Sequence, residues 1–307
     1  MLESSPRASA PVRPTETFVR HPRRRPSLPL GAALRVLAHA ARATRSDGEA
    51  FDPDRLDRRD PRVIAELEAD LGAISRDWLR LSVRGESAIH PRPCVYVANH
   101  NGGIMGPDLF CTTHVLWRAL GPGAPLYAMA HDFAMAHVHP LGRMLQRIGA
   151  IRASPVNAQR VLAAGGSVLV YPGGDLDAFR HFERRNEIVF GTRTGFVKIA
   201  RDAGVPIVPI VAHGAHRSAI IFHEGEWIAR TLGLTRWSRL QRFPLALALP
   251  WGIAPGPWMP YAPLPFPIQL RVLPPIEVPR ACSLEAMRDE VVSAMQHAMD
   301  EMAGAAQ

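Results

Sequence analysis

The chain has 307 residues, of which 47% are hydrophobic and 21% are charged. This composition suits one large core, or one core with a small helical addition, and excludes a wholly disordered chain. The net charge of +8 is concentrated in residues 1–46, which hold nine arginines and two glutamates. Cys94, Cys111 and Cys282 have no CxxC pairing or metal-site spacing, so we expect a reducing compartment rather than a disulfide framework.

The N-terminal arm, residues 1–29, is rich in Pro, Ser and Arg and is predicted to be disordered. It has no apolar stretch, so no secretory signal is expected, although its Arg-rich, acid-poor composition is shared by organelle transit peptides. The chain has 35 arginines and only one lysine, a bias that makes the basic charge weak support for a polyanionic partner. Interleaved aromatic residues and a recognition motif are lacking, so nucleic acid is not an expected partner.

Two helices are predicted next, over residues 30–45 and 61–80, with a charged linker at 46–60. The first would be amphipathic, and it could lie in a lipid headgroup layer or dock on the rest of the domain. Its apolar face comprises Leu30, Ala33, Leu34, Leu37 and Ala41, and its basic face comprises Arg35, His39, Arg42 and Arg45.

Strands and helices then alternate, which predicts an α/β fold with a central, mostly parallel sheet flanked by helices and an N-terminal helical extension. Ser154-Pro155 is a typical helix start, and Gly165-Gly166 a typical stop. The expected strands cover 94–98, 167–171, 205–211 and 269–273, and further helices cover 194–203 and 283–302. In the last helix the core-facing residues would be Met287, Val291, Met295 and Met299.

Residues 243–268 do not fit this alternation, because they contain eight prolines and no charge. Prolines at this density cannot maintain a membrane-spanning helix, so we expect an apolar loop or hairpin. Trp251, Trp258 and Tyr261 favour contact with a membrane interface, and the alternative is a loop packed over the core. Aromatic and cationic residues suited to an anionic lipid surface precede it: Trp227, Arg230, Trp237, Arg239 and Arg242.

The first chemical motif, residues 99–108, follows directly after a buried strand and reads Asn-His-Asn-Gly-Gly-Ile-Met-Gly-Pro-Asp. Histidine can remove a proton from a hydroxyl near neutral pH, and a nearby carboxylate can fix its tautomer. Gly106-Pro107 interrupts any helix, so His100 and Asp108 are expected to meet through loop geometry. One histidine and one aspartate are by themselves a weak signal.

The second motif, residues 171–180, also follows a strand and reads Tyr-Pro-Gly-Gly-Asp-Leu-Asp-Ala-Phe-Arg. Exposed glycine N–H groups can bind phosphate or a developing oxyanion. We therefore expect backbone N–H groups near Gly102-Gly103 or Gly173-Gly174 to stabilise such an oxyanion.

Together with Gly149–Pro155 and the prolines at 206 and 209, these motifs form four blocks in order. The pattern resembles that of the glycerolipid and lysophospholipid acyltransferase superfamily, over roughly residues 80–280. Its Pro-Gly-Gly form looks like the monoacylglycerol and diacylglycerol acyltransferase branch. With the segments described above, the chain is expected to comprise a disordered basic arm (1–29), N-terminal helices (30–80) and an acyltransferase domain (81–307).

The resemblance implies that His100 is the catalytic base and Asp108 its partner. It also implies an acyl-CoA or acyl carrier protein donor, a lipid hydroxyl as acceptor, and neither metal nor redox cofactor. The implied substrate-binding residues are Asn99, Gly102, Gly103, Tyr171, Pro172, Gly173, Gly174 and Asp177. Asp177 could instead anchor its own loop. Donor phosphates would meet Arg152 or Arg180, although either could be a solvated surface charge.

Two departures from the family pattern bear on these roles. Seven residues separate His100 from Asp108, where the family usually has four. The second block lacks an arginine at about Pro155 to hold an acceptor phosphate, which favours a neutral glyceride or another alcohol. The pairs His137/His139 and His213/His216 have spacings that can bind zinc, but no partner ligand is fixed by sequence. A GxSxG context is missing, which disfavours a serine hydrolase.

The expected protein is thus a membrane-associated O-acyltransferase of lipid metabolism. It would be cytoplasmic and peripheral on the inner face of an anionic membrane. The alternative from another class is a catalytically silent lipid-binding protein on the same scaffold.

Overall fold

The computed structural model describes residues 25–43, 50–103, 106–131, 135, 139–237, 240–249, 251–256 and 262–305. Most of the N-terminal arm predicted to be disordered lies outside the described residues. The same is true of Trp258, Tyr261 and Arg239.

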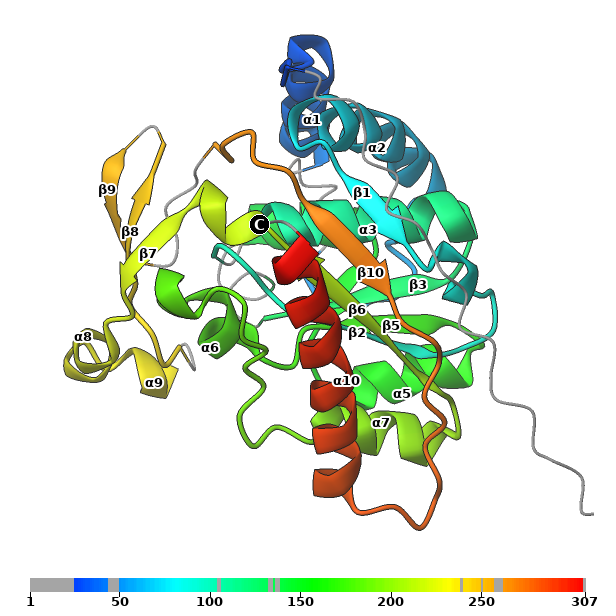
Figure 1. The fold of residues 1–307 in the computed structure, drawn as a ribbon. Helices are drawn as coiled ribbons and strands as arrows, with labels where there is room; N and C mark the ends of the chain where they lie inside the picture. Colours follow the sequence, from blue (N-terminus) through cyan, green and yellow to red (C-terminus); the bar gives the residue numbers. More distant parts are fainter. Residues whose placement is uncertain are drawn as a thin grey trace, which may run out of the picture.

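A seven-stranded sheet forms the centre of the molecule, in the order β1-β10-β6-β2-β5-β3-β4 (Figure 1). Only the β10–β6 pair is antiparallel among these strands, so the expected α/β class with a mostly parallel sheet is confirmed. The strands are β1 (Ser82–Arg84), β2 (Val95–Ala98), β3 (Leu126–Ala130), β4 (Ala150–Arg152), β5 (Ser167–Val170), β6 (Ile207–His213) and β10 (Gln269–Val272).

Helices cover both faces of this sheet, because the side chains of its central strands alternate between two apolar cores. Val95 and Val97 of β2 pack with residues of α5 (Pro155–Ala163), α7 (Gly195–Ala203) and α10 (Leu284–Ala305). Tyr96 and Ala98 pack on the other face, with residues of α2 (Pro61–Ala73) and α3 (Pro107–Leu120). The remaining helical elements are α1 (Leu30–Ala43), α4 (His139–Arg147), α6 (Gly174–Ala178), α8 (Glu226–Thr231), α9 (Leu234–Trp237), a π turn at Ile74–Trp78 and 3₁₀ turns at Glu86–Ala88, Phe182–Arg184 and Ala215–Ser218.

The predicted helix boundaries correspond to real caps. The Ser154 side chain accepts a hydrogen bond from the Asn157 N–H at 3.1 Å, and Pro155 is the first residue of α5. Gly204 ends α7 in the left-handed conformation, with φ +65°. The four predicted core positions of α10 are all buried: Met287, Val291, Met295 and Met299.

The N-terminal helix α1 docks on the domain but leaves its leucines outside. Ala32 is 2% exposed, and Arg35 forms a 2.6 Å ion pair with Asp70 of α2. The stripe of Leu30, Leu34 and Leu37 remains between 63% and 65% exposed. Docking is therefore observed, and lipid contact by the leucine stripe stays a prediction.

The uncharged segment 243–268 was expected to form an apolar loop or a hairpin, and its described part contains a hairpin. Its strands β8 (Leu245–Ala248) and β9 (Gly252–Pro255) join β7 (Ile220–His223) in a second, antiparallel sheet that projects beside the main one (Figure 1). Alanines of β8 and β9 are buried on its inner face, whereas Leu247 and Ile253, which pair across the strands, are 51% and 64% exposed. Among the described helices, none has both the length and the hydropathy of a membrane span.

Candidate active site

The loop that carries His100 begins at a fixed point of the sheet. Asn99 follows β2 and is fully buried, and its side chain clamps the backbone of Ala212 on β6. Its Nδ2 donates to the Ala212 carbonyl at 3.0 Å, and its Oδ1 accepts from the Ala212 N–H at 2.7 Å. Both ends of the Asn99 amide are thus engaged in joining two strands, so the structure assigns this side chain a positioning part rather than contact with substrate.

The structure brings Asp108 to His100 despite the long spacing. His100 Nδ1 and Asp108 Oδ2 are 2.9 Å apart, and the Asn101 N–H donates to the same carboxylate oxygen at 3.1 Å. Asp108 is fully buried and lies in the first turn of α3, because Pro107 starts that helix rather than interrupting one. With Nδ1–H donated to the carboxylate, Nε2 is the nitrogen that can accept a proton.

The loop between the two residues depends on glycine. Gly102 and Gly103 have φ values of +77° and +95°, a region that other residues rarely adopt. A Cβ on Gly106 would lie 2.2 Å from both the Asn101 carbonyl oxygen and Asp108 Oδ1. Glycine at these positions is what allows seven intervening residues to close on the His100–Asp108 pair.

Asp177 and Arg180 form a buried ion pair beneath the His100 loop. Asp177 accepts hydrogen bonds from the backbone N–H groups of His100 at 2.5 Å and Val189 at 3.1 Å. Arg180 is 1% exposed; it pairs with Asp177 and donates to the His100 carbonyl at 3.2 Å and to Asn101 Oδ1. Burial raises the pKa of Asp177, and the Arg180 guanidinium and the two backbone donors oppose that shift. Asp177 therefore anchors the catalytic loop as well as its own.

The expectation that Arg180 or Arg152 meets donor phosphates is not supported by this geometry. Arg180 is enclosed by its partners and cannot reach a ligand without breaking the pair. Arg152 ends β4, which is three strand spacings from β2, or roughly 14 Å at ~4.8 Å per strand. It is bound there to Asp54. Arg152 is thus a half-exposed surface residue, as one of the two alternatives expected, whereas Arg180 is buried, which neither alternative expected.

The Tyr171-Pro172-Gly173-Gly174 turn follows β5 and lies beside the catalytic loop. The Tyr171 ring is 5.0 Å from the His100 ring, centroid to centroid, and burial raises the pKa of its hydroxyl well above 10. A Cβ on Gly173 would lie 2.3 Å from Asp177 Cβ, so a side chain there would displace the anchor.

Arg193, which no sequence motif indicates, holds this turn through its guanidinium. Its guanidinium donates to the carbonyls of Pro172 and Gly173 and pairs with Asp175 at 3.1 Å. Asp175 in turn accepts from the Gln241 N–H at 2.5 Å. No local pattern identifies Arg193, because it follows the turn by about twenty residues and its role comes from the fold.

His216 joins the site from the 3₁₀ turn after β6. Its Nδ1 accepts a hydrogen bond from the Gly102 N–H at 3.2 Å, and the residue is 2% exposed. Burial, together with the nearby charges of Arg180 and His100, holds the pKa of His216 well below the usual 6.5. Burial beside Arg217 and Arg185 lowers the pKa of His213 to about 4.

The backbone donors expected for an oxyanion are already engaged. The Gly103 N–H donates to the Ala178 carbonyl, and the Gly174 N–H to the Tyr171 carbonyl, each at 3.0 Å. Gly102 donates to His216, as described above. The N–H groups of Gly102, Gly103 and Gly174 each complete a turn or a contact between loops, so each would have to leave its present partner to bind an oxyanion.

Within the described residues, no three His, Cys, Asp or Glu side chains gather as a metal site would require. His213 and His216 lie in this part of the chain, whereas His137 lies outside the described residues.

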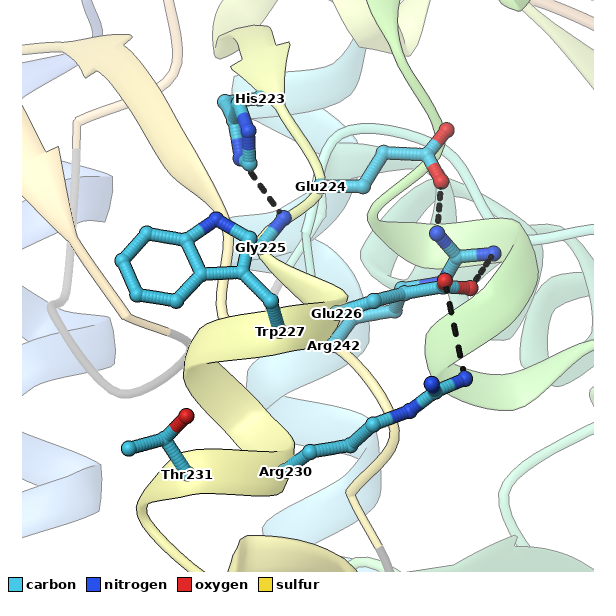
Figure 2. A pocket seen from close by; sticks show the side chains of 8 residues that line it. All are labelled: His223, Glu224, Gly225, Glu226, Trp227, Arg230, Thr231 and Arg242. Carbon is cyan, nitrogen blue, oxygen red and sulfur yellow. Dashed lines mark hydrogen bonds and ion pairs between the residues drawn. The ribbon is translucent and has the colours of Figure 1, made fainter.

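A cavity of about 550 Å³ is lined mainly by residues of β7, of α8 and of the segment that joins them (Figure 2). Arg242 crosses it to pair with Glu224 and Glu226, and Figure 2 shows the Trp227 ring standing apart from this charged group. The Glu224 carboxylate also accepts from the His181 N–H at 2.8 Å, which ties the cavity wall to the segment after Arg180. The lining residues are His223, Glu224, Gly225, Glu226, Trp227, Arg230, Thr231 and Arg242.

Comparison with known proteins gives consistent matches. Residues 80–213 match the family model described as Acyltransferase. An uncharacterized protein of Mycobacterium tuberculosis is 28% identical over 184 residues, which are 59% of this chain and 50% of that protein. Human diacylglycerol O-acyltransferase 2 is 28% identical over 141 residues, which are 42% of this chain and 35% of that enzyme.

The chain thus spans half the length, or less, of these curated relatives. Among solved structures, the 1-acyl-sn-glycerophosphate acyltransferase PlsC from Thermotoga maritima superposes with a TM-score of 0.48 at 16% sequence identity. That superposition covers 87% of this chain and 89% of the other.

Proposed function

Because this chain belongs to the glycerolipid acyltransferase superfamily through its domain at residues 80–213, we propose that it transfers a fatty acyl group from a thioester to a lipid hydroxyl. The observation that carries the proposal is the 2.9 Å contact between His100 Nδ1 and Asp108 Oδ2, on a glycine loop at the end of β2. This contact leaves Nε2 as the proton acceptor.

The reaction proceeds by direct transfer. His100 Nε2 removes the proton of the acceptor hydroxyl, and the hydroxyl oxygen attacks the thioester carbonyl carbon. The carbon–sulfur bond then breaks as the ester forms, and the His100 imidazolium returns the proton to the departing thiolate. Asp108 stabilises the imidazolium between these steps, and the Asp177–Arg180 pair holds the loop that carries His100.

The acceptor in this proposal is an uncharged lipid alcohol, such as a mono- or diglyceride. A phosphorylated acceptor would require a cation beside His100 that is free to bind it. Arg180 is committed to Asp177, and Arg152 is committed to Asp54 across the sheet. The donor is an acyl thioester of coenzyme A or of acyl carrier protein.

The protein would work at the surface of an anionic membrane, on the cytoplasmic side. The exposed leucine stripe of α1 and the outer face of the β7–β8–β9 sheet support this placement, because contiguous exposed apolar surface marks an interaction site. Arg42, an exposed cation in the last turn of α1, lies on the same helix as the leucine stripe.

The test is an acyl-transfer assay with the purified chain. The donor is labelled acyl-CoA or labelled acyl–acyl carrier protein, and the vesicles contain a monoglyceride, a diglyceride or a lysophospholipid as acceptor. We expect ester product from the wild type, with His100→Ala and Asp108→Asn each lowering kcat by about 10²–10⁴-fold. His297→Ala, an exposed histidine on α10, is the matched control and should retain full activity.

Thermal unfolding should show that both site variants remain folded. Absence of product with every acceptor would favour the alternative of a catalytically silent lipid-binding protein. Equal turnover by the wild type and His100→Ala would remove His100 from the chemistry.

A further inference from the structure

The inferred reaction needs a hydrogen-bond donor for the thioester carbonyl oxygen, which becomes negatively charged. Most backbone N–H groups of the catalytic loop already have acceptors. Its successive N–H groups each donate within the protein, from His100 to Asp177, Asn101 to Asp108, Gly102 to His216 and Gly103 to Ala178. On the opposite turn, the Gly174 N–H donates to Tyr171. A backbone oxyanion hole is therefore not available from these five groups without breaking contacts that shape the site.

The His216 imidazole beside the loop carries a buried donor that lacks a partner among the described residues. His216 Nδ1 accepts from the Gly102 N–H, so the ring proton must reside on Nε2. Nε2 has no hydrogen-bond partner in the described part of the chain, although the residue is only 2% exposed. An unpaired buried donor is costly, and such groups are retained where a ligand completes them.

The position of His216 relates it directly to the base. It contacts Gly102, two residues after His100, and the two imidazoles are close enough for the His100 charge to act on His216. His216 comes from the end of β6 and His100 from the end of β2, two neighbouring parallel strands. The two rings therefore converge at the carboxyl ends of the strands, where α/β sheets bind their ligands.

We propose that His216 Nε2–H donates a hydrogen bond to the thioester carbonyl oxygen and stabilises it as it becomes an oxyanion. This inference rests on the acyl transfer proposed above. As the acceptor oxygen bonds to the carbonyl carbon, negative charge moves onto the carbonyl oxygen. The carbon–oxygen double bond forms again when the carbon–sulfur bond breaks, and the negative charge passes to the departing sulfur. A neutral imidazole suits this task, since its N–H can donate a hydrogen bond to the carbonyl oxygen without carrying a positive charge.

Two substitutions separate the two nitrogens of His216. His216→Asn places an amide oxygen near the Nδ1 position, so Gly102 keeps its acceptor while the Nε2 donor is lost. His216→Gln places an amide N–H near the Nε2 position, so the donor is kept. We expect His216→Asn to lower kcat by about 10²–10³-fold with little change in KM for the donor, and His216→Gln to recover activity to within about tenfold of wild type.

The outcomes distinguish this proposal from its premise. Absence of ester product with the wild-type protein would refute acyl transfer itself. Wild-type turnover with an unchanged kcat in His216→Asn would overturn the role of His216 alone. Equal losses in both variants, together with a lowered Tm, would also overturn it, because His216 would then only position Gly102. Should His216→Asn not fold, a wild-type-like kcat in His216→Gln still supports the donor, and a kcat as low as that of His100→Ala contradicts it.

Discussion

The His100 loop and the β7–β8–β9 sheet place polar and apolar side chains in opposite ways. Beneath the loop, Asp177 and Arg180 are buried to 1% exposure or less and satisfy one another. On the second sheet, Leu247 and Ile253 are about half or more exposed and have alanines on the inner face behind them. Each arrangement is costly in an isolated domain, since burying charge and exposing apolar surface are both unfavourable. Such costs are expected where a reaction or a partner requires them.

The largest expected effect is on the buried pair. Asp177→Ala leaves the Arg180 guanidinium without its counter-charge and removes the acceptor of the His100 and Val189 N–H groups. We expect a loss of about 3–5 kcal/mol in the free energy of unfolding, since uncompensated buried charge is strongly destabilising. Urea denaturation followed by circular dichroism measures this.

The matched control is an exposed ion pair of the same kind. Lys198 and Asp202 pair at the surface of α7, so Asp202→Ala should leave the urea midpoint unchanged. If Asp177→Ala also unfolded at the wild-type midpoint, the pair would not anchor the loop, and the contrast between the two regions would lose its energetic basis.

The sequence predicted the parts of this contrast that follow from local pattern. The central strands, the cap at Ser154 and the buried face of α10 arise from hydrophobic periodicity and capping chemistry, which are written in adjacent residues. The candidate base and its carboxylate were also found, because a histidine directly after a buried strand is a local signal. The uncharged 243–268 segment was recognised as a hairpin or loop from its prolines.

The parts that escaped prediction depend on contacts between distant segments. Strands β1 and β4 have three residues each, too few for a periodic signal. His216 meets Gly102 across 114 positions and Arg193 meets Gly173 across 20, and neither pairing leaves a trace in sequence spacing. The inner role of Arg180 was missed for a statistical reason, because arginine without a visible partner is normally placed at the surface.

The second prediction uses pH to test the burial of the histidines that follow the core of β6. Burial, with Arg217 and Arg185 nearby, lowers the pKa of His213 from 6.5 to about 4, so the unfolded state binds more protons between those pH values. Stability from this group is complete above pH 6.5 and is lost as the pH falls towards 4. We expect about 2 kcal/mol less stability at pH 5 than at pH 7 from His213, and a further loss from His216.

Urea midpoints at pH 7 and pH 5 test this expectation. His213→Gln should reduce the difference between the two midpoints, whereas His297→Ala, at an exposed position of α10, should leave it unchanged. An identical pH difference in His213→Gln and the wild type would mean that His213 is not the group that resists protonation.

The smallest effect concerns the second sheet, and it decides whether that surface meets lipid. Ile253→Ser removes an apolar side chain that is 64% exposed, so stability should change by no more than about 0.5 kcal/mol. Binding to vesicles with anionic lipid should weaken about tenfold, because a side chain of this size contributes ~1.5–3 kcal/mol when fully buried and less at an interface. Val156→Ser on α5 deletes a similar area that is 65% exposed, on a helix that packs against the main sheet. Sedimentation with vesicles should distinguish the two variants. If binding depended on general surface hydrophobicity, both substitutions would weaken it equally, whereas if the hairpin faces the membrane, only Ile253→Ser would weaken it.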